Sequence, residues 1–176
     1  MNIRNTMSSG ANQRWPFGKK NCKYDMNTLN PEYRYDVNRL LKAAYVRDIV
    51  VQIEVWATFR YYGDTWTNHN PFNPAHNINY TAKESGLPLV NTSHPTRADN
   101  PFFRTVPEHM NNTVVLADQQ KYVDRLLSIT MKYNNVLFPM DNETSVDARW
   151  GAYWAGYIKE AYKAAGKTAY VTEMWD

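Results

Sequence analysis

The stretch Ile49-Val50-Val51-Gln52-Ile53-Glu54-Val55-Trp56 decides the class of fold. It is short and rich in β-branched residues, which favours a strand over a helix. Because side chains alternate along a strand, one face carries Ile49, Val51, Ile53 and Val55, and the other carries Gln52, Glu54 and Trp56. Neither face suits open solvent, which is typical of a parallel strand between a layer of helices and a barrel interior.

A helix is predicted immediately before this strand. Asn30 is a suitable N-cap, Pro31 suits the first helical position, and Glu32 places an acid in the first turn. Apolar side chains then recur at helical spacing through about residue 48, namely Tyr33, Val37, Leu40, Leu41 and Ala44. Residues 2–10 read as the end of a strand that runs into a Ser-Ser-Gly turn, and residues 11–30 read as a loop.

Downstream of the strand, the chain alternates between helical and strand patterns. Residues 58–114 show little periodicity, and loops of this length in compact domains are usually functional or disordered. The aromatic content of this segment argues against disorder. The elements predicted after it are a helix over residues 118–133, a strand over 136–140, a helix over 148–165 and a strand over 168–173. This rhythm predicts one α/β domain over residues 1–176, in which right-handed βαβ units build a parallel sheet.

Composition excludes several classes of protein. With 43% hydrophobic and 21% charged residues, the chain has enough apolar material for a core and is not disordered. The net charge is only +3 and the basic residues are scattered, so neither nucleic acid nor a membrane surface is expected as a partner. The single cysteine, Cys22, excludes an internal disulfide and a four-cysteine zinc site. No apolar run is long enough to span a membrane.

Three of the predicted strands end in acidic or polar groups. These groups are Glu54 with Trp56, Asn142 with Glu143, and Glu173 with Asp176. In parallel α/β barrels the loops after the strand ends form the active site, so the groups are expected to converge. Converging carboxylates suit cleavage of a glycosidic bond, in which one carboxylic acid protonates the leaving oxygen and a second carboxylate attacks the sugar or activates water.

Each acid also has a structural interpretation. An acid after a strand is often the N-cap of the next helix, but Ser145 or Asp147 fills that role better than Glu143. Glu54 lies in an apolar strand and either serves the site or simply pairs with Arg4. Glu173 is either a site residue or an exposed charge.

The four histidines lie in the long irregular segment. They lack the spacing of a metal site, so no metal and no other cofactor is predicted. His69 or His76 could still line a sugar site. The aromatic content of 14%, with 6 Trp and 13 Tyr, favours sugar binding only weakly, because most such rings fill cores.

The stretch Asn135-Val136-Leu137-Phe138-Pro139-Met140-Asp141-Asn142-Glu143-Thr144 resembles the fourth-strand motif of clan A glycoside hydrolases, typified by cellulases and mannanases. In that motif Asn-Val opens the strand and Asn-Glu closes it. The resemblance implies that Glu143 is the general acid/base and that Asn142 holds the 2-hydroxyl of the sugar. Asn2-Ile3-Arg4 is similar to the end of the family's second strand, where an arginine lies near the nucleophile.

The resemblance implies a partial (β/α)8 TIM barrel, about half of one, that covers strands two to five. A full barrel takes about 250 residues. The family's first strand would precede Asn2, and its nucleophile, a glutamate on the seventh strand, would follow Asp176. Trp56 stands where the family often has histidine. Glu173 is expected on the fifth strand, so it is not assigned as the nucleophile.

The leading hypothesis is a retaining glycoside hydrolase that acts on a poly- or oligosaccharide, with Glu143 as acid/base. The residues expected to line the sugar site with it are Asn142, Arg4, Glu54, Trp56, Trp15, Trp66, Glu173 and Trp175. Retention would place the two catalytic carboxyl groups about 5–5.5 Å apart. The isolated chain, which lacks the expected nucleophile, is predicted to be inactive or nearly so.

Two other hypotheses stay open. One is a non-catalytic carbohydrate-binding module, and the other is a half-barrel that self-associates through open sheet edges. The sequence does not decide the sugar, the linkage or the compartment. A secreted or periplasmic protein would need a signal peptide upstream of Met1, because residues 1–5 lack the apolar core of one.

Overall fold

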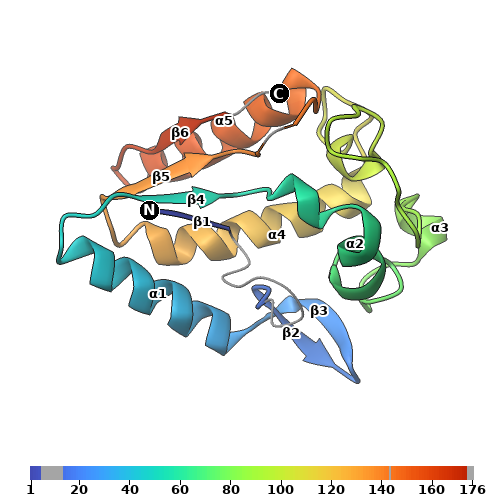
Figure 1. The fold of residues 1–176 in the computed structure, drawn as a ribbon, viewed down its shortest axis with the longest axis horizontal. Helices are drawn as coiled ribbons and strands as arrows, with labels where there is room; N and C mark the ends of the chain where they lie inside the picture. The colour runs from blue at the N-terminus through green and yellow to red at the C-terminus, as the bar shows by residue number, and fades with distance from the viewer. Residues whose placement is uncertain (5–13, 143, 174–176) are drawn as a thin grey trace.

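The computed structural model describes residues 1–4, 14–142 and 144–173. Within these residues the chain is an α/β structure built on a four-stranded parallel sheet of order β1-β4-β5-β6. The strands are β1 (Asn2–Arg4), β4 (Val51–Glu54), β5 (Val136–Pro139) and β6 (Tyr170–Thr172). Figure 1 shows them side by side, with the segment that follows β4 gathered at one end of the sheet. The predicted α/β class and parallel sheet are confirmed.

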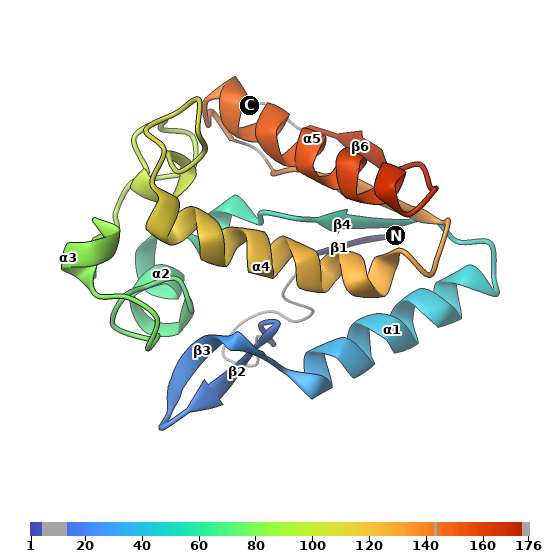
Figure 2. The ribbon, with the colours of Figure 1, turned by 180° about the vertical axis from the view of Figure 1, so that it is seen from behind.

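Three long helices connect these strands and cover one face of the sheet. They are α1 (Pro31–Tyr45), α4 (Thr113–Thr130) and α5 (Ala148–Ala164). Each crossover leads to the next strand along, always in the same direction across the sheet. Because such crossovers are right-handed, they place all three helices on the same side, and Figure 2 shows the helices together in front of the strands.

The three helices predicted from periodicity are confirmed, but the strand at residues 49–56 is shorter than predicted. Only Val51–Glu54 is extended and paired. Ile49 is exposed in the turn between α1 and β4, so it does not belong to the buried face of the strand. Val51 and Ile53 are fully buried, whereas Gln52 on the opposite face is half-buried.

The prediction of a loop over residues 11–30 was wrong for its second half. Strands β2 (Phe17–Lys20) and β3 (Lys23–Leu29) form an antiparallel hairpin there. The two turn residues, Asn21 and Cys22, both have positive φ angles of 51° and 64°. Two consecutive positive φ angles give the turn whose twist matches that of the flanking strands, so a tight hairpin can form without glycine.

The long segment between β4 and α4 holds only short helices. These are η2 (Thr58–Arg60), α2 (Gly63–His69), α3 (Ala82–Ser85) and η3 (Pro101–Phe103). Buried asparagine amides take the place of regular hydrogen bonding. The Asn73 amide donates to the carbonyls of Trp66 and Leu89, both at 2.9 Å, and the Asn91 amide donates to the Tyr61 carbonyl at 2.9 Å. This explains how a segment with little periodicity stays ordered.

Aromatic rings fill the core between the sheet, the helices and the long segment. Trp56 lies at its centre, stacked on Tyr122 of α4 with ring centroids 5.0 Å apart. Trp154 of α5 is 4.9 Å from it, and Phe102 of η3 is 5.8 Å from it. One ring therefore joins two helices and the long segment to the end of β4.

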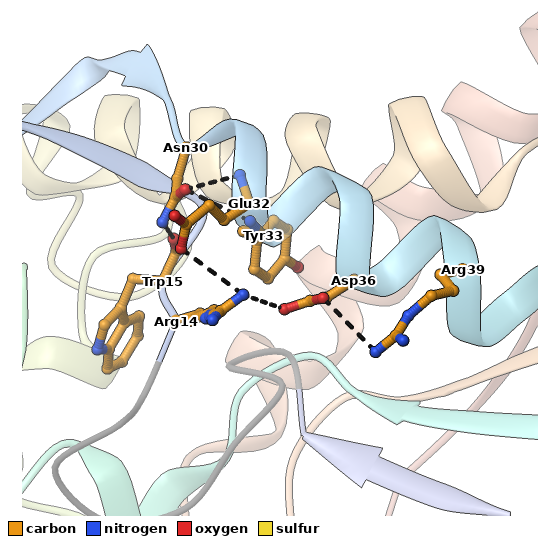
Figure 3. Close-up of polar contacts among 7 residues, drawn as sticks. All are labelled: Arg14, Trp15, Asn30, Glu32, Tyr33, Asp36 and Arg39. Atoms are coloured by element: carbon orange, nitrogen blue, oxygen red, sulfur yellow. Dashed lines mark hydrogen bonds and ion pairs between the residues drawn. The ribbon is translucent and has the colours of Figure 1, made fainter.

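The side chain of Asn30 holds the start of α1 in place. Its Oδ1 accepts hydrogen bonds from the backbone N–H groups of Glu32 and Tyr33, at 3.0 and 3.4 Å, and its Nδ2 donates to the Trp15 carbonyl at 3.1 Å. Figure 3 shows this cap beside the ion pairs that Arg14 makes with Glu32 and Asp36. The cap thus couples α1 to the chain that enters the hairpin.

We expect Asn30→Ala to lower the free energy of unfolding by about 1–2 kcal/mol, because it removes the N-cap. Asn30→Asp is the matched control, since aspartate keeps the cap but cannot donate to the Trp15 carbonyl. Urea denaturation measures both. A loss in Asn30→Asp as large as in Asn30→Ala would show that the bond to Trp15, and not the cap, provides the stability.

Candidate functional site

The ends of the four parallel strands carry charged and polar side chains at one edge of the sheet. Arg4 at the end of β1 is in register with Glu54 at the end of β4. Asp141 follows β5 and forms a bridge with Trp56, which follows β4. Glu173 comes directly after Thr172, which pairs with Pro139 of β5. The predicted convergence of these chain segments is therefore present in the structure.

Arg4 and Glu54 form an ion pair, with Nε and Oε2 3.6 Å apart. The Glu54 side chain is almost completely buried, whereas that of Arg4 is nearly half exposed. The prediction that Glu54 pairs with Arg4 is thus confirmed. The pair also lies at the strand ends, so its presence does not exclude a role in binding.

Arg60 adds a second guanidinium to this pair. It belongs to η2 and is 8% exposed. Burial lowers the pKa of Arg60, the nearby charge of Arg4 lowers it further, and Glu54 raises it. Sequence inspection missed Arg60 because it lies in the long segment, where no periodicity indicates which side chains turn inward.

Among the described acids at the strand ends, Asp141 has the most strongly shifted pKa. Its side chain is fully buried, and neither carboxyl oxygen has a hydrogen-bond partner among the described residues. Burial, and to a lesser extent the negative charge of Glu173, raises the pKa of Asp141 to about 8. Asp141 is therefore largely protonated at neutral pH. It stands just before Asn142 in the quoted motif, yet sequence inspection did not select it as a site residue.

Glu173 turns toward the helix layer. Its Oε1 is buried without a hydrogen-bond partner among the described residues, and a Cβ placed on Gly151 of α5 would collide with that carboxylate. Burial raises the pKa of Glu173. A glycine at position 151 thus makes room for an acid beside Asp141, so Glu173 is not simply an exposed surface charge.

The loop between β5 and α5 is fixed on both sides of position 143. The Thr58 hydroxyl donates to the Asn142 carbonyl at 2.6 Å, and the Thr144 hydroxyl donates to the Pro95 carbonyl at 3.2 Å. The side chain of Asn142 is partly accessible, as a sugar-binding residue must be. Two of the expected site residues, Glu143 and Trp175, lie outside the described residues.

Three tryptophans expected to line the sugar site are core residues instead. Trp15, Trp56 and Trp66 are each at most 1% exposed, so their faces are not open for stacking on a sugar. For Trp56 the cause is a break in the strand alternation. The consecutive N–H groups of Val55 and Trp56 donate to consecutive carbonyls, those of Pro139 and Met140, and the Trp56 ring lies among helix side chains.

The described part of the chain contains no group of three or more His, Cys, Asp or Glu side chains arranged to hold a metal ion. None of its helices is both long and apolar enough to cross a membrane. The strand-end residues offer acids, amides and guanidinium groups, which together can transfer protons and bind hydroxyl or oxyanion groups.

Comparison of the chain with family models, curated proteins and solved structures finds no match in any of the three.

Proposed function

We propose that this chain supplies the acid/base side of the active site of a retaining glycoside hydrolase with a (β/α)8-barrel fold. The observation that carries the proposal is that four neighbouring parallel strands each end in a charged or polar group. These groups are Arg4, Glu54, Asp141 with Asn142, and Glu173. Active sites of parallel barrels are built at this edge from the ends of several strands.

The winding of the sheet supports a barrel over a doubly wound fold. In a doubly wound sheet the strand order reverses and helices cover both faces. Here the order β1-β4-β5-β6 follows the chain without reversal, and the three long helices lie on one face (Figure 2). In a barrel, such a singly wound sheet curves so that its face without helices becomes the inside.

In the proposed reaction, the Glu143 carboxylic acid gives its proton to the glycosidic oxygen as the bond to the leaving sugar breaks. A second carboxylate attacks the anomeric carbon, and Glu143 then removes a proton from the water that releases the sugar. Asn142 holds the 2-hydroxyl next to the reacting carbon. We do not assign the attacking carboxylate to Glu173, because its side chain packs against Gly151 of α5.

We expect Glu143→Gln in an enzyme that contains this chain to lower turnover of unactivated oligosaccharides by about 10²-fold or more, because glutamine cannot donate a proton. Aryl glycosides with a strongly acidic leaving phenol need little protonation in the first step, so their bond cleavage should suffer much less. Steady-state hydrolysis of both substrate types measures this difference.

The matched control for this experiment is Glu160→Gln. Glu160 is an exposed acid on α5, and its Oε1 lies 3.9 Å from the Lys163 Nζ. It should hydrolyse both substrate types at the original rate. Equal turnover of unactivated substrates by Glu143→Gln and the unaltered protein would refute the acid/base assignment. Saturable sugar binding without any hydrolysis would instead support a non-catalytic carbohydrate-binding module.

A further inference from the structure

A pocket of about 460 Å³ lies between the β2–β3 hairpin and the chain at the end of α2 and beyond it. This volume is within the range of ligand sites, which is roughly 300–1,000 Å³. The polar side chains that line it are Lys19, Lys23, His69, His76, Asn21 and Asn68. The hairpin follows β1 and α2 follows β4, so both walls belong to connections that leave the carboxyl edge of the sheet.

The charge of the pocket is one-sided. The described part of its lining includes two lysines and two histidines but no aspartate or glutamate. Among the described residues, neither Lys19 nor Lys23 takes part in an ion pair. The Lys19 ammonium lies 4.8 Å from the centre of the Tyr24 ring, which holds it at the pocket wall without neutralising it. The pocket therefore favours an anion.

Backbone hydrogen bonds join the two walls. The Tyr24 N–H donates to the His76 carbonyl at 2.7 Å, and the Ile78 N–H donates to the Tyr24 carbonyl at 3.0 Å. The His76 Nδ1 lies 3.1 Å from the Asn70 carbonyl, which can only accept, so Nδ1 carries a proton. Its Nε2 remains for a ligand. The pocket is thus built before any ligand arrives.

We propose that this pocket binds the carboxylate or sulfate group of an acidic saccharide. Lys19 and Lys23 attract the oxyanion, and the amides of Asn21 and Asn68 can pair with sugar hydroxyls. Trp15 also lines the pocket, and its buried indole N–H has no hydrogen-bond partner among the described residues. The saccharide part of this assignment rests on the proposed function, whereas the anion part stands on the pocket alone.

Cys22 provides a probe of the pocket, because it is the only thiol of the chain, is exposed and lies in the pocket lining. Its alkylation by iodoacetate, an anion, is compared with alkylation by neutral iodoacetamide. Any change in the reactivity of the thiol itself affects both reagents, so the ratio of the two rates reports the local potential. We expect this ratio to fall about threefold or more in a Lys19→Ala/Lys23→Ala double variant.

Lys20→Ala is the matched control. Lys20 is on the same hairpin and pairs with Lys23 across it, but it does not line the pocket. Its removal should change the rate ratio much less than the double variant does. An equal change in both would show that general hairpin charge, and not the pocket, attracts the anionic reagent, and would overturn the proposal.

Ligand binding is then read as protection of Cys22 from iodoacetamide by glucuronate, glucose 6-sulfate, glucose and inorganic sulfate. We expect glucuronate and glucose 6-sulfate to protect Cys22, and the one that protects at the lower concentration identifies the preferred oxyanion. In the double variant, the concentration for half-protection should rise about tenfold, equivalent to about 1.4 kcal/mol. Equal protection by glucose, or by inorganic sulfate, would overturn the acidic-saccharide assignment. The readout needs no hydrolysis, so its failure is distinguishable from failure of the proposed enzyme activity.

Discussion

Asp141→Asn is expected to stabilise the folded protein above pH 8 by several kcal/mol, while its effect near pH 4 should be small. Asparagine has nearly the shape of a protonated aspartic acid and cannot ionise. The side chain of Asp141 is fully buried without a hydrogen-bond partner among the described residues. Ionisation of this group therefore costs free energy in the folded state that the unfolded state does not pay.

The sign of the pH dependence follows from proton binding. The pKa of Asp141 is 3.8 in the unfolded reference and about 8 in the folded protein, so between these values the folded state holds the extra proton. Stability then falls as pH rises through this window. Each unit of pKa difference corresponds to about 1.4 kcal/mol, so the full shift amounts to a cost of about 6 kcal/mol at pH above 8.

Urea denaturation at pH 4 to 9 of the original protein and Asp141→Asn measures this effect. Asp147→Asn is a control of opposite sign, because its bonds to Arg149 lower the pKa of Asp147. That variant should lose stability at neutral pH and match the original protein only when the medium is strongly acidic. Parallel stability curves for Asp141→Asn and the original protein would show that Asp141 is not buried as a neutral acid.

Trp56→Ala is expected to lower the free energy of unfolding by about 3–5 kcal/mol, the cost typical of removing a large buried aromatic side chain. The ring is 0% exposed and lies against Tyr122, Trp150 and Trp154 from two different helices. Its loss leaves a cavity that these helices cannot close without moving relative to the sheet. Chemical denaturation followed by far-UV circular dichroism gives the size of the effect.

Two further variants separate the effect of the lost side-chain volume from the effect of its position in the core. Trp56→Phe keeps an aromatic ring in the same place and should lose clearly less stability than Trp56→Ala. Leu89→Ala removes an apolar side chain that is 51% exposed and should change stability by less than about 0.5 kcal/mol. A loss in Trp56→Ala no larger than that of Leu89→Ala would contradict the central position of Trp56 in the core.

The regular part of the fold was predictable because its signals are local. Asn30, Pro31 and the apolar spacing that follows them specify α1 without reference to the rest of the chain. The β2–β3 hairpin was missed because its turn uses positive φ angles at Asn21 and Cys22 and not a glycine. The bridge from Tyr24 to the distant Asn77 that supports it is not visible in a local pattern.

The candidate site was predictable in its position but not in its members. Parallel strands bring their carboxyl ends to one edge, so Glu54 and Glu173 could be grouped from strand order alone, whereas Arg4 was added as a possible partner of Glu54 and through the resemblance. Asp141 was missed because its perturbation comes from burial and from a neighbour on another strand. Trp56 was assigned to the wrong environment because alternation cannot be extended past the end of a strand, where the backbone changes its hydrogen-bonding pattern.

The buried amides of the long segment also limit how this protein can evolve. Asn73 and Asn91 secure the segment through backbone carbonyls, and Phe102 brings the same segment into contact with Trp56. Exchange of the whole segment by recombination would remove part of the hydrophobic core as well as the loop. New specificities should therefore arise by single substitutions on its accessible surface, and descendants of this chain should keep its length and its asparagines while their outward-facing residues diverge.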